Sequence, residues 1–310
     1  MLRMILSLFV LLSSPICLPS ILQLWTSFVS VFLFPLFSFA FSVFDSPVYA
    51  YALPVFLLAS LLISIKKRTP VCLFACVLFT IALWLPFYLK SPFPKEENAD
   101  PVDYVSLCIS LSQKAEEAYT SFIPSSLVPE RSKEAVKSLF PNRIIGARPK
   151  FSKAGTVLKR FSAAGIFLPF TGEAVISPVE PDIALPFTAC HELSHRLGFF
   201  HEGDANLTAF YACILSEYPE FRYSGYLHAL KYAYLRIPAS DTEALEKASN
   251  ALPEKIMRDL LRLGAFDESA RDTSAFPPFA GDYGDMTEKL IYNERNKKSL
   301  GILIPSDPTA

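Results

Sequence analysis

The chain lacks the cysteine patterns that organise small secreted domains or cysteine zinc sites. It contains six cysteines in 310 residues, and none has the short C-x-x-C spacing. Cys108, Cys190 and Cys213 lie in the polar part of the chain, and an odd number there argues against a disulfide framework. We therefore expect these three to be small buried residues.

Acidic side chains are almost absent from the first 90 residues, which hold five basic groups and a single acid, Asp45. The remaining 220 residues carry 24 basic and 29 acidic groups. This asymmetry is typical of a membrane region followed by a soluble, mildly acidic domain that is large enough for one buried core. No basic stripe runs through the second part, which argues against a nucleic-acid partner.

The apolar first part predicts membrane spans and makes the lipid bilayer an expected partner. The stretches that approach the ~20 apolar residues of a span are residues 2–20, 49–65 and 71–89. Residues 21–44 either lie in the interface or form a fourth span. For residues 1–20, a cleavable signal peptide is the alternative, although no small-x-small cleavage site is evident before Ile21.

The charges near these stretches favour three spans over four. The basic run at 66–68 should stay in the cytoplasm, and three spans place both this run and Arg3 inside. The chain then leaves the membrane after residue 89 on the outer side. We therefore expect the domain that follows to be extracytoplasmic.

A proline-rich, charged linker over residues 91–101 leads into a domain over residues 102–310 in which helical patterns dominate. Short strands are expected at Gly165–Phe170 and Ala174–Ile176. A capping box of Ser240 and Glu243 should start one helix. The other helices are expected at Val105–Tyr119, Glu130–Phe140, Phe187–Leu197, Gly203–Glu217, Arg222–Arg236 and Pro253–Leu263. The expected fold class is α+β, mostly helical.

Histidine is scarce, yet three of the four histidines fall within eleven residues, starting with His191-Glu192-Leu193-Ser194-His195. H-E-x-x-H on a helix places two imidazoles on one face, one turn apart, as ligands of Zn²⁺. Glu192 then holds the water that completes the coordination and takes its proton as general base. A helix that ends at Gly198 in a left-handed cap fits this motif.

The third ligand has three candidates. His201 completes the metzincin spacing H-E-x-x-H-x-x-G-x-x-H. Glu202 begins an E-x-x-A-N run that is similar to the E-x-x-A-D/N signature of gluzincin-type membrane proteases, and Asn206 would then orient a ligand histidine. Asp204 is the third candidate. The unbroken helical pattern after Glu202 favours a set of His191, His195 and Glu202.

The run PFTACHELSH at Pro186–His195, continuing to Asn206 and Cys213, resembles the bacterial membrane family catalogued as domain of unknown function 3810. The segments Gly165–Glu173 and Phe221–Tyr226 are similar to it as well, and so is the layout of three spans before the domain. The family usually has an arginine at the position of His201 and E-D-E-A-N where this chain has E-G-D-A-N. The resemblance implies a zincin-like hydrolase fold and names no substrate.

These observations predict a membrane-anchored zinc metallopeptidase that cleaves a peptide or protein substrate. The Phe167–Phe170 strand is a candidate for pairing with a peptide substrate by edge addition, and plain sheet structure is the alternative. The candidates for the group that stabilises the tetrahedral intermediate are Arg222, Tyr223, Tyr226 and His228.

Two other functions compete with this prediction. One is a non-catalytic membrane-bound protein that keeps the zinc fold for binding or sensing, although the intact Glu192 argues against it. The other is an intramembrane protease, which is disfavoured because the motif lies about 100 residues past the last span in a charged domain.

Overall fold

The computed structural model describes residues 91, 93–121, 123–143, 145–152, 164–168, 172–265 and 284–296. The predicted spans at 2–20, 49–65 and 71–89 and the segment 21–44 lie outside these ranges. Within the described residues, no helix combines the length and the apolar character needed to cross a bilayer.

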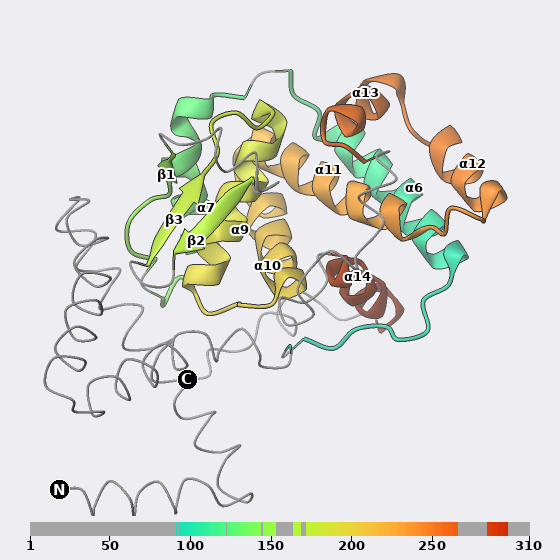
Figure 1. The fold of residues 1–310 in the computed structure, drawn as a ribbon, viewed down its shortest axis with the longest axis horizontal. Coiled ribbons are helices and arrows are strands. Elements are labelled where there is room, and N and C mark those ends of the chain that lie inside the picture. Colours follow the sequence, from blue (N-terminus) through green and yellow to red (C-terminus); the bar gives the residue numbers. More distant parts are fainter. Residues whose placement is uncertain are drawn as a thin grey trace, which may run out of the picture.

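The described residues form a mostly helical α+β fold with one small sheet, as the sequence predicts (Figure 1). The sheet lies beside α9, while α6, α11, α12 and α13 gather on the other side of the molecule. The helices are α6 (Pro101–Glu117), α7 (Val128–Leu139), α9 (Leu185–Arg196), α10 (Glu202–Ile214), α11 (Pro219–Arg236), α12 (Thr242–Asn250), α13 (Glu254–Arg262) and α14 (Asp285–Arg295), with short 3-10 turns η3 (Ser125–Leu127) and η4 (Asp182–Ala184).

The sheet consists of β1 (Lys150–Phe151), β2 (Gly165–Leu168) and β3 (Glu173–Ile176), in the order β1-β3-β2. β1 pairs with β3 in parallel, and β2 pairs with β3 in antiparallel register. β2 therefore lies at one edge of the described strands, and both β2 and β3 pack against α9. The predicted strand at Gly165–Phe170 is described as far as Leu168, because 169–171 lie outside the described ranges.

Helix α9 is buried on every side along its whole length. Pro186 stands in its first turn, where a missing N–H costs no hydrogen bond. Gly198 adopts φ +97° just after the helix, and Phe199 N–H donates to the Ser194 carbonyl across that turn. The expected left-handed cap is thus confirmed. Because water cannot reach the polar side chains of α9, each of them needs a protein partner or a ligand.

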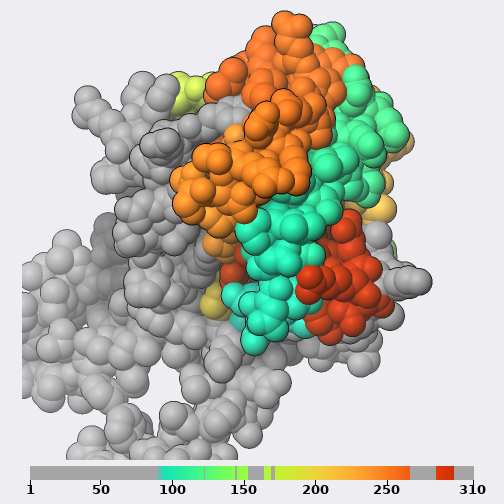
Figure 2. Space-filling view, turned by 90° about the vertical axis from the view of Figure 1, so that its right-hand side faces the viewer, coloured from blue at the N-terminus to red at the C-terminus, as the bar shows by residue number. Residues whose placement is uncertain are grey.

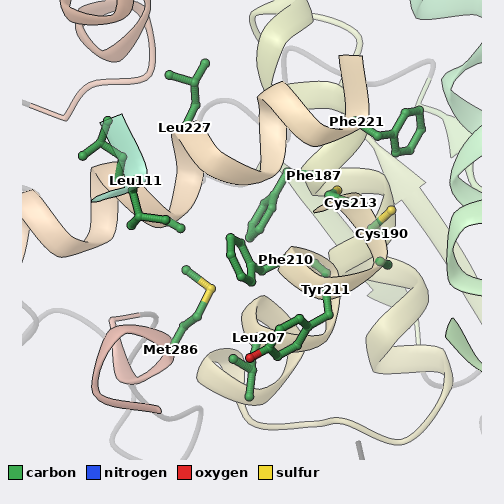
Figure 3. Packing of buried hydrophobic residues seen from close by; sticks show 14 of the residues in the cluster. Leu111, Phe187, Cys190, Leu207, Phe210, Tyr211, Cys213, Phe221, Leu227 and Met286 are labelled. Atoms are coloured by element: carbon green, nitrogen blue, oxygen red, sulfur yellow. The ribbon is translucent and has the colours of Figure 1, made fainter. Parts of the chain in front are cut away.

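The core joins α9 to α10 and α11, and α11 to α6. In Figure 3, Phe187 of α9 lies beside Phe210 of α10, with Met286 of α14 facing the same cluster. Ser224 of α11 also ties the start of α9, because its hydroxyl donates to the Ile183 carbonyl at 2.6 Å and accepts from Phe187 N–H at 3.2 Å. The cysteines Cys108, Cys190 and Cys213 are buried and free, as expected.

Two local expectations were wrong or incomplete. α12 is capped by Asp241, whose carboxylate accepts from Ala244 N–H at 3.0 Å, and not by a Ser240–Glu243 box. A charged acceptor three residues before a free N–H satisfies that donor directly, so the helix begins one residue later than predicted. α14 was not predicted, and Figure 2 shows it along α6 on the face that also carries α12.

Arg196, at the end of α9, holds the sheet against the helix. Its guanidinium donates to the Gly172 carbonyl at 2.7 Å, in the turn between β2 and β3, and to the Ala147 carbonyl before β1. Burial lowers the pKa of Arg196 to about 10, against the opposing charge of Glu173, so the group stays charged at neutral pH. One buried charge therefore fixes three strands relative to the motif helix.

We predict that Arg196→Met lowers the free energy of unfolding by roughly 2–4 kcal/mol, because it leaves buried carbonyls without a donor. Denaturant unfolding of the purified full chain measures this. Arg148→Met is the matched control, because its side chain is 64% exposed in a surface ion pair and its loss should cost about 0.5 kcal/mol or less. Equal effects of the two substitutions would contradict the role of Arg196.

Candidate metal centre

Three metal-ligand side chains meet between α9 and α10. The ligand atoms of His191, His195 and Glu202 all lie within 4.8 Å of one another. The two histidines come from successive turns of α9, and Glu202 is the first residue of α10. The connection through Gly198 brings the start of α10 back to the histidine face of α9.

The separations of these atoms match those around a tetrahedral metal ion. His191 Nε2 lies 3.0 Å from His195 Nε2 and 3.0 Å from Glu202 Oε2, and the third side of the triangle is 3.6 Å. Ligands bound to zinc at about 2.0–2.2 Å are separated by roughly 3.3–3.5 Å in a tetrahedron. A zinc-sized ion therefore fits among the three atoms with little adjustment.

The other ring nitrogens fix which nitrogen of each histidine carries the proton. His191 Nδ1 lies 2.7 Å from Asn206 Oδ1, and His195 Nδ1 lies 2.8 Å from the Phe199 carbonyl. Both oxygens can only accept, so each Nδ1 donates its hydrogen and each neutral ring has a lone pair on Nε2. These lone pairs converge on Glu202 Oε2, which is buried and, among the described residues, accepts no hydrogen bond of good geometry. Such a group of acceptors requires a cation.

The pKa shifts of His195 and Glu202 agree with this requirement. Burial would lower the pKa of His195, but the Glu202 carboxylate outweighs it and raises the pKa to about 9. Burial would likewise raise the pKa of Glu202, but His195 and then His191 hold that pKa well below its usual range. In metal-free protein a proton on His195 thus supplies the positive charge that the three atoms need.

Glu192 lies beside the three ligands and is 5% exposed. Burial raises the pKa of Glu192 to about 7, against the opposing charges of His191 and His195. Its side chain packs directly on the backbone of β2, because a Cβ added at Gly165 would lie 2.6 Å from Glu192 Oε1 and 2.8 Å from its Cγ. A carboxyl with this pKa, next to a bound water, can exchange a proton near neutral pH.

The two alternative ligands lie outside the cluster. His201 occupies the N-cap position of α10, where burial lowers its pKa, and within the described part of the chain its buried Nε2 has no hydrogen-bond partner. Asp204 forms a buried ion pair with Lys289 of α14 and accepts a hydrogen bond from Ser91. Among the described residues, the ligand cluster takes in Glu202 and neither of these two.

Three of the four candidates for stabilising the tetrahedral intermediate are held elsewhere. Tyr223 is fully buried, and its hydroxyl donates to Asp259 at 2.7 Å. Arg222 donates to the Ser216 carbonyl at 2.8 Å, beyond the end of α10. The ring of Tyr226 packs edge-on against Phe210 in the core.

His228 is closer to the motif helix, but its chemistry differs from the expected one. Its ring stacks on Phe187 with centroids 4.2 Å apart, one turn before His191 on α9. Its Nδ1 donates to the Ser224 carbonyl at 2.9 Å, and burial lowers the pKa of His228 to about 3. The neutral ring therefore presents an acceptor at Nε2, which does not suit stabilisation of a negative oxygen.

The fold and this site define a mostly helical α+β domain with a potential His-His-Glu metal centre around H-E-x-x-H. Comparison with protein-family models matches residues 18–280 to the family described as "Protein of unknown function (DUF3810)", and the chain belongs to this family. Searches of the curated proteins and of the solved structures give no match.

Sequence reasoning missed two contributors to the site. Gly165 was recognised only as the start of a strand, although a glycine is what lets β2 approach Glu192 so closely. Lys289 lies in α14, whose polar sequence gave no sign that one lysine would be buried. Its place in the sequence, far from the motif, offered no signal either.

We predict that metal-free protein loses stability as pH rises from about 6.5 to about 9. Below pH 6.5 the loss from Glu192 is offset by His228, whose pKa is lowered from 6.5 to about 3, so that its contribution to stability grows as pH rises. Glu192 has a folded pKa raised from 4.5 to about 7, so its protonated form favours the folded state and this contribution disappears between those values. His195, raised from 6.5 to about 9, contributes stability below 6.5 that is lost as pH passes through 9. Thermal unfolding of the chelator-treated full chain against pH measures both.

Glu192→Gln isolates the first of these contributions, because glutamine does not titrate. The difference in unfolding free energy between wild type and variant should change by on the order of 3 kcal/mol between pH 4 and pH 8. A difference that does not change with pH would show that Glu192 has an ordinary pKa.

Proposed function

We propose that this chain is a membrane-anchored zinc-dependent metallopeptidase with its metal site outside the cytoplasm. The observation that carries the proposal is the convergence of two imidazole nitrogens and one carboxylate oxygen beside a buried glutamate. Catalytic zinc sites commonly use three protein ligands and keep the fourth position for water. A purely structural site has no need of Glu192.

His191, His195 and Glu202 would hold the ion, and Asn206 and the Phe199 carbonyl orient the two rings. Zinc held there would supply a water with a pKa near 7 and would polarise the substrate carbonyl. Glu192 would accept the proton of the attacking water and pass it to the leaving amine. The buried surroundings keep other water away from this proton transfer.

A peptide substrate would lie along β2. β2 lies at one edge of the described strands, packed against α9, and an extended peptide that follows this edge would run past the motif helix. Gly165 places this strand directly against Glu192, and the Phe167 ring lies 6.3 Å from the His195 ring. A peptide on this edge would bring its carbonyl groups near the metal centre, which favours peptide hydrolysis over other hydrolytic reactions.

We predict that Glu192→Gln keeps zinc and loses hydrolysis. The full chain, purified in detergent, should contain about one zinc per molecule in both forms, because Glu192 is not a ligand. Cleavage of membrane and secreted proteins, compared by quantitative proteomics of cells with wild type and variant, should fall about 10²–10⁴-fold. Glu202→Gln is the contrasting variant, because it should lose the metal as well.

The competing function is a zinc-fold binding or sensing module without catalysis. If Glu192→Gln retains zinc and every cleavage product of the wild type persists unchanged, the enzyme proposal fails and the module remains. If reconstituted wild-type protein holds no transition metal at all, both functions fail.

We predict that Gly165→Ala also separates metal binding from catalysis. Alanine adopts strand conformation without difficulty, but its Cβ overlaps the Glu192 side chain at 2.6 Å and displaces it. Zinc content should stay at the wild-type level while cleavage falls at least about tenfold. Ile166→Ala is the matched control on the same strand, because this side chain is 39% exposed. Full activity in Gly165→Ala would show that the contact does not matter.

A further inference from the structure

The start of the described domain contacts the supports of the metal centre. Ser91 Oγ donates to Asp204 Oδ1 at 2.5 Å, and Asp204 lies in the first turn of α10, two residues after Glu202. The Phe93 ring stacks on Phe199 with centroids 5.7 Å apart. The first residues of the predicted linker at 91–101 are therefore packed into the domain.

Phe199 matters because its carbonyl orients a metal ligand. It accepts from His195 Nδ1 at 2.8 Å, and this contact directs the Nε2 lone pair of His195 toward Glu202. The Phe199 side chain is held between Phe93 and Phe140, each with its ring centroid 5.7 Å away. A shift of Phe93 would therefore be transmitted through Phe199 to the ligand ring.

Lys289 of α14 completes the contact with α10. Its ammonium pairs with Asp204 Oδ1, the same oxygen that accepts from Ser91, and the two side chains of this pair are 1% and 2% exposed. The Lys289 ammonium also lies 6.0 Å from the centroid of the Phe93 ring. Burying two charges is costly, and such pairs contribute more to a specific arrangement than to net stability.

We propose that Ser91, Phe93 and Lys289 are positioning residues of the metal centre. Ser91 and Lys289 hold the first turn of α10, which carries Glu202, while Phe93 holds the turn that orients His195. The inference rests on the proposed function, since it concerns the same metal site. Because Ser91 lies two residues after the last predicted span, at 71–89, it would tie the ligand geometry to the point where the chain is expected to leave the membrane.

A purely structural role would have a different signature. Loss of stability alone would lower the unfolding temperature but leave the zinc affinity of the folded protein unchanged. A positioning role changes the zinc affinity and the coordination geometry of protein that is still folded. Outer contacts of this kind typically affect metal affinity 10–100-fold.

The test uses the full chain in detergent, with zinc affinity measured by chelator competition and coordination followed by the visible absorption of bound Co²⁺. Lys289→Met should weaken zinc binding about 10–100-fold, and Phe93→Ala about tenfold, with an altered Co²⁺ spectrum in both. Leu260→Ala is the control of matched destabilisation, because this residue is fully buried in α13, which packs on α6 and α11. It should lower the unfolding temperature and leave the zinc affinity within about twofold.

A double variant guards against a general folding defect. Asp204→Asn with Lys289→Met removes both buried charges, so stability should recover relative to Lys289→Met alone while zinc affinity stays about tenfold weak. If wild type binds zinc and the affinity of these variants is unchanged, or recovers in step with stability, the positioning role is overturned and the proposed function survives. If wild type binds no transition metal, the proposed function fails and the inference fails with it.

Discussion

Two lone pairs and a carboxylate oxygen pointing at one another cannot be stable without a positive charge between them. This constraint governs the centre of the fold: His191 Nε2 approaches both His195 Nε2 and Glu202 Oε2 as closely as hydrogen-bonded atoms do, yet the opposite nitrogens of both rings already donate to acceptors. A proton or a metal ion resolves the conflict. A divalent ion does so better, because three ligands bind it simultaneously whereas a proton is shared between two atoms at a time.

The surrounding structure is organised to keep that group of acceptors in place. Helix α9 is buried along its length, so its imidazoles have little freedom to turn toward water. Arg196 anchors the sheet to the same helix, and β2 then presses against Glu192 through Gly165. The repulsion among the three ligand atoms is thus offset by packing and by the hydrogen bonds that Asn206 and the Phe199 carbonyl make with the two imidazoles.

Much of this could be predicted from the sequence because it depends on local spacing. His191 and His195 lie one turn of α9 apart, and Gly198 marks the end of that helix. The motif, its helix and its C-cap could therefore be predicted from the local sequence alone. The ranking of Glu202 above His201 and Asp204 rested on the helical pattern after Glu202, and the ligand cluster agrees with it. What could not be predicted depends on contacts between distant segments, such as Gly165 with Glu192 or Lys289 with Asp204, which no local pattern records.

The pKa of Glu192 depends on whether a cation is bound, and this connects the metal site to the proposed proton transfer. Without a metal, burial raises this pKa to about 7, and the carboxyl is partly protonated at neutral pH. A divalent charge held by His191, His195 and Glu202 adds to the positive potential that already opposes this rise, so it favours the ionised form. In the proposed mechanism, Glu192 would then act as a base toward the water that the ion holds. The same burial that makes an empty set of ligands costly would therefore favour the proposed proton transfer in an occupied set, and one geometric arrangement would account for both properties.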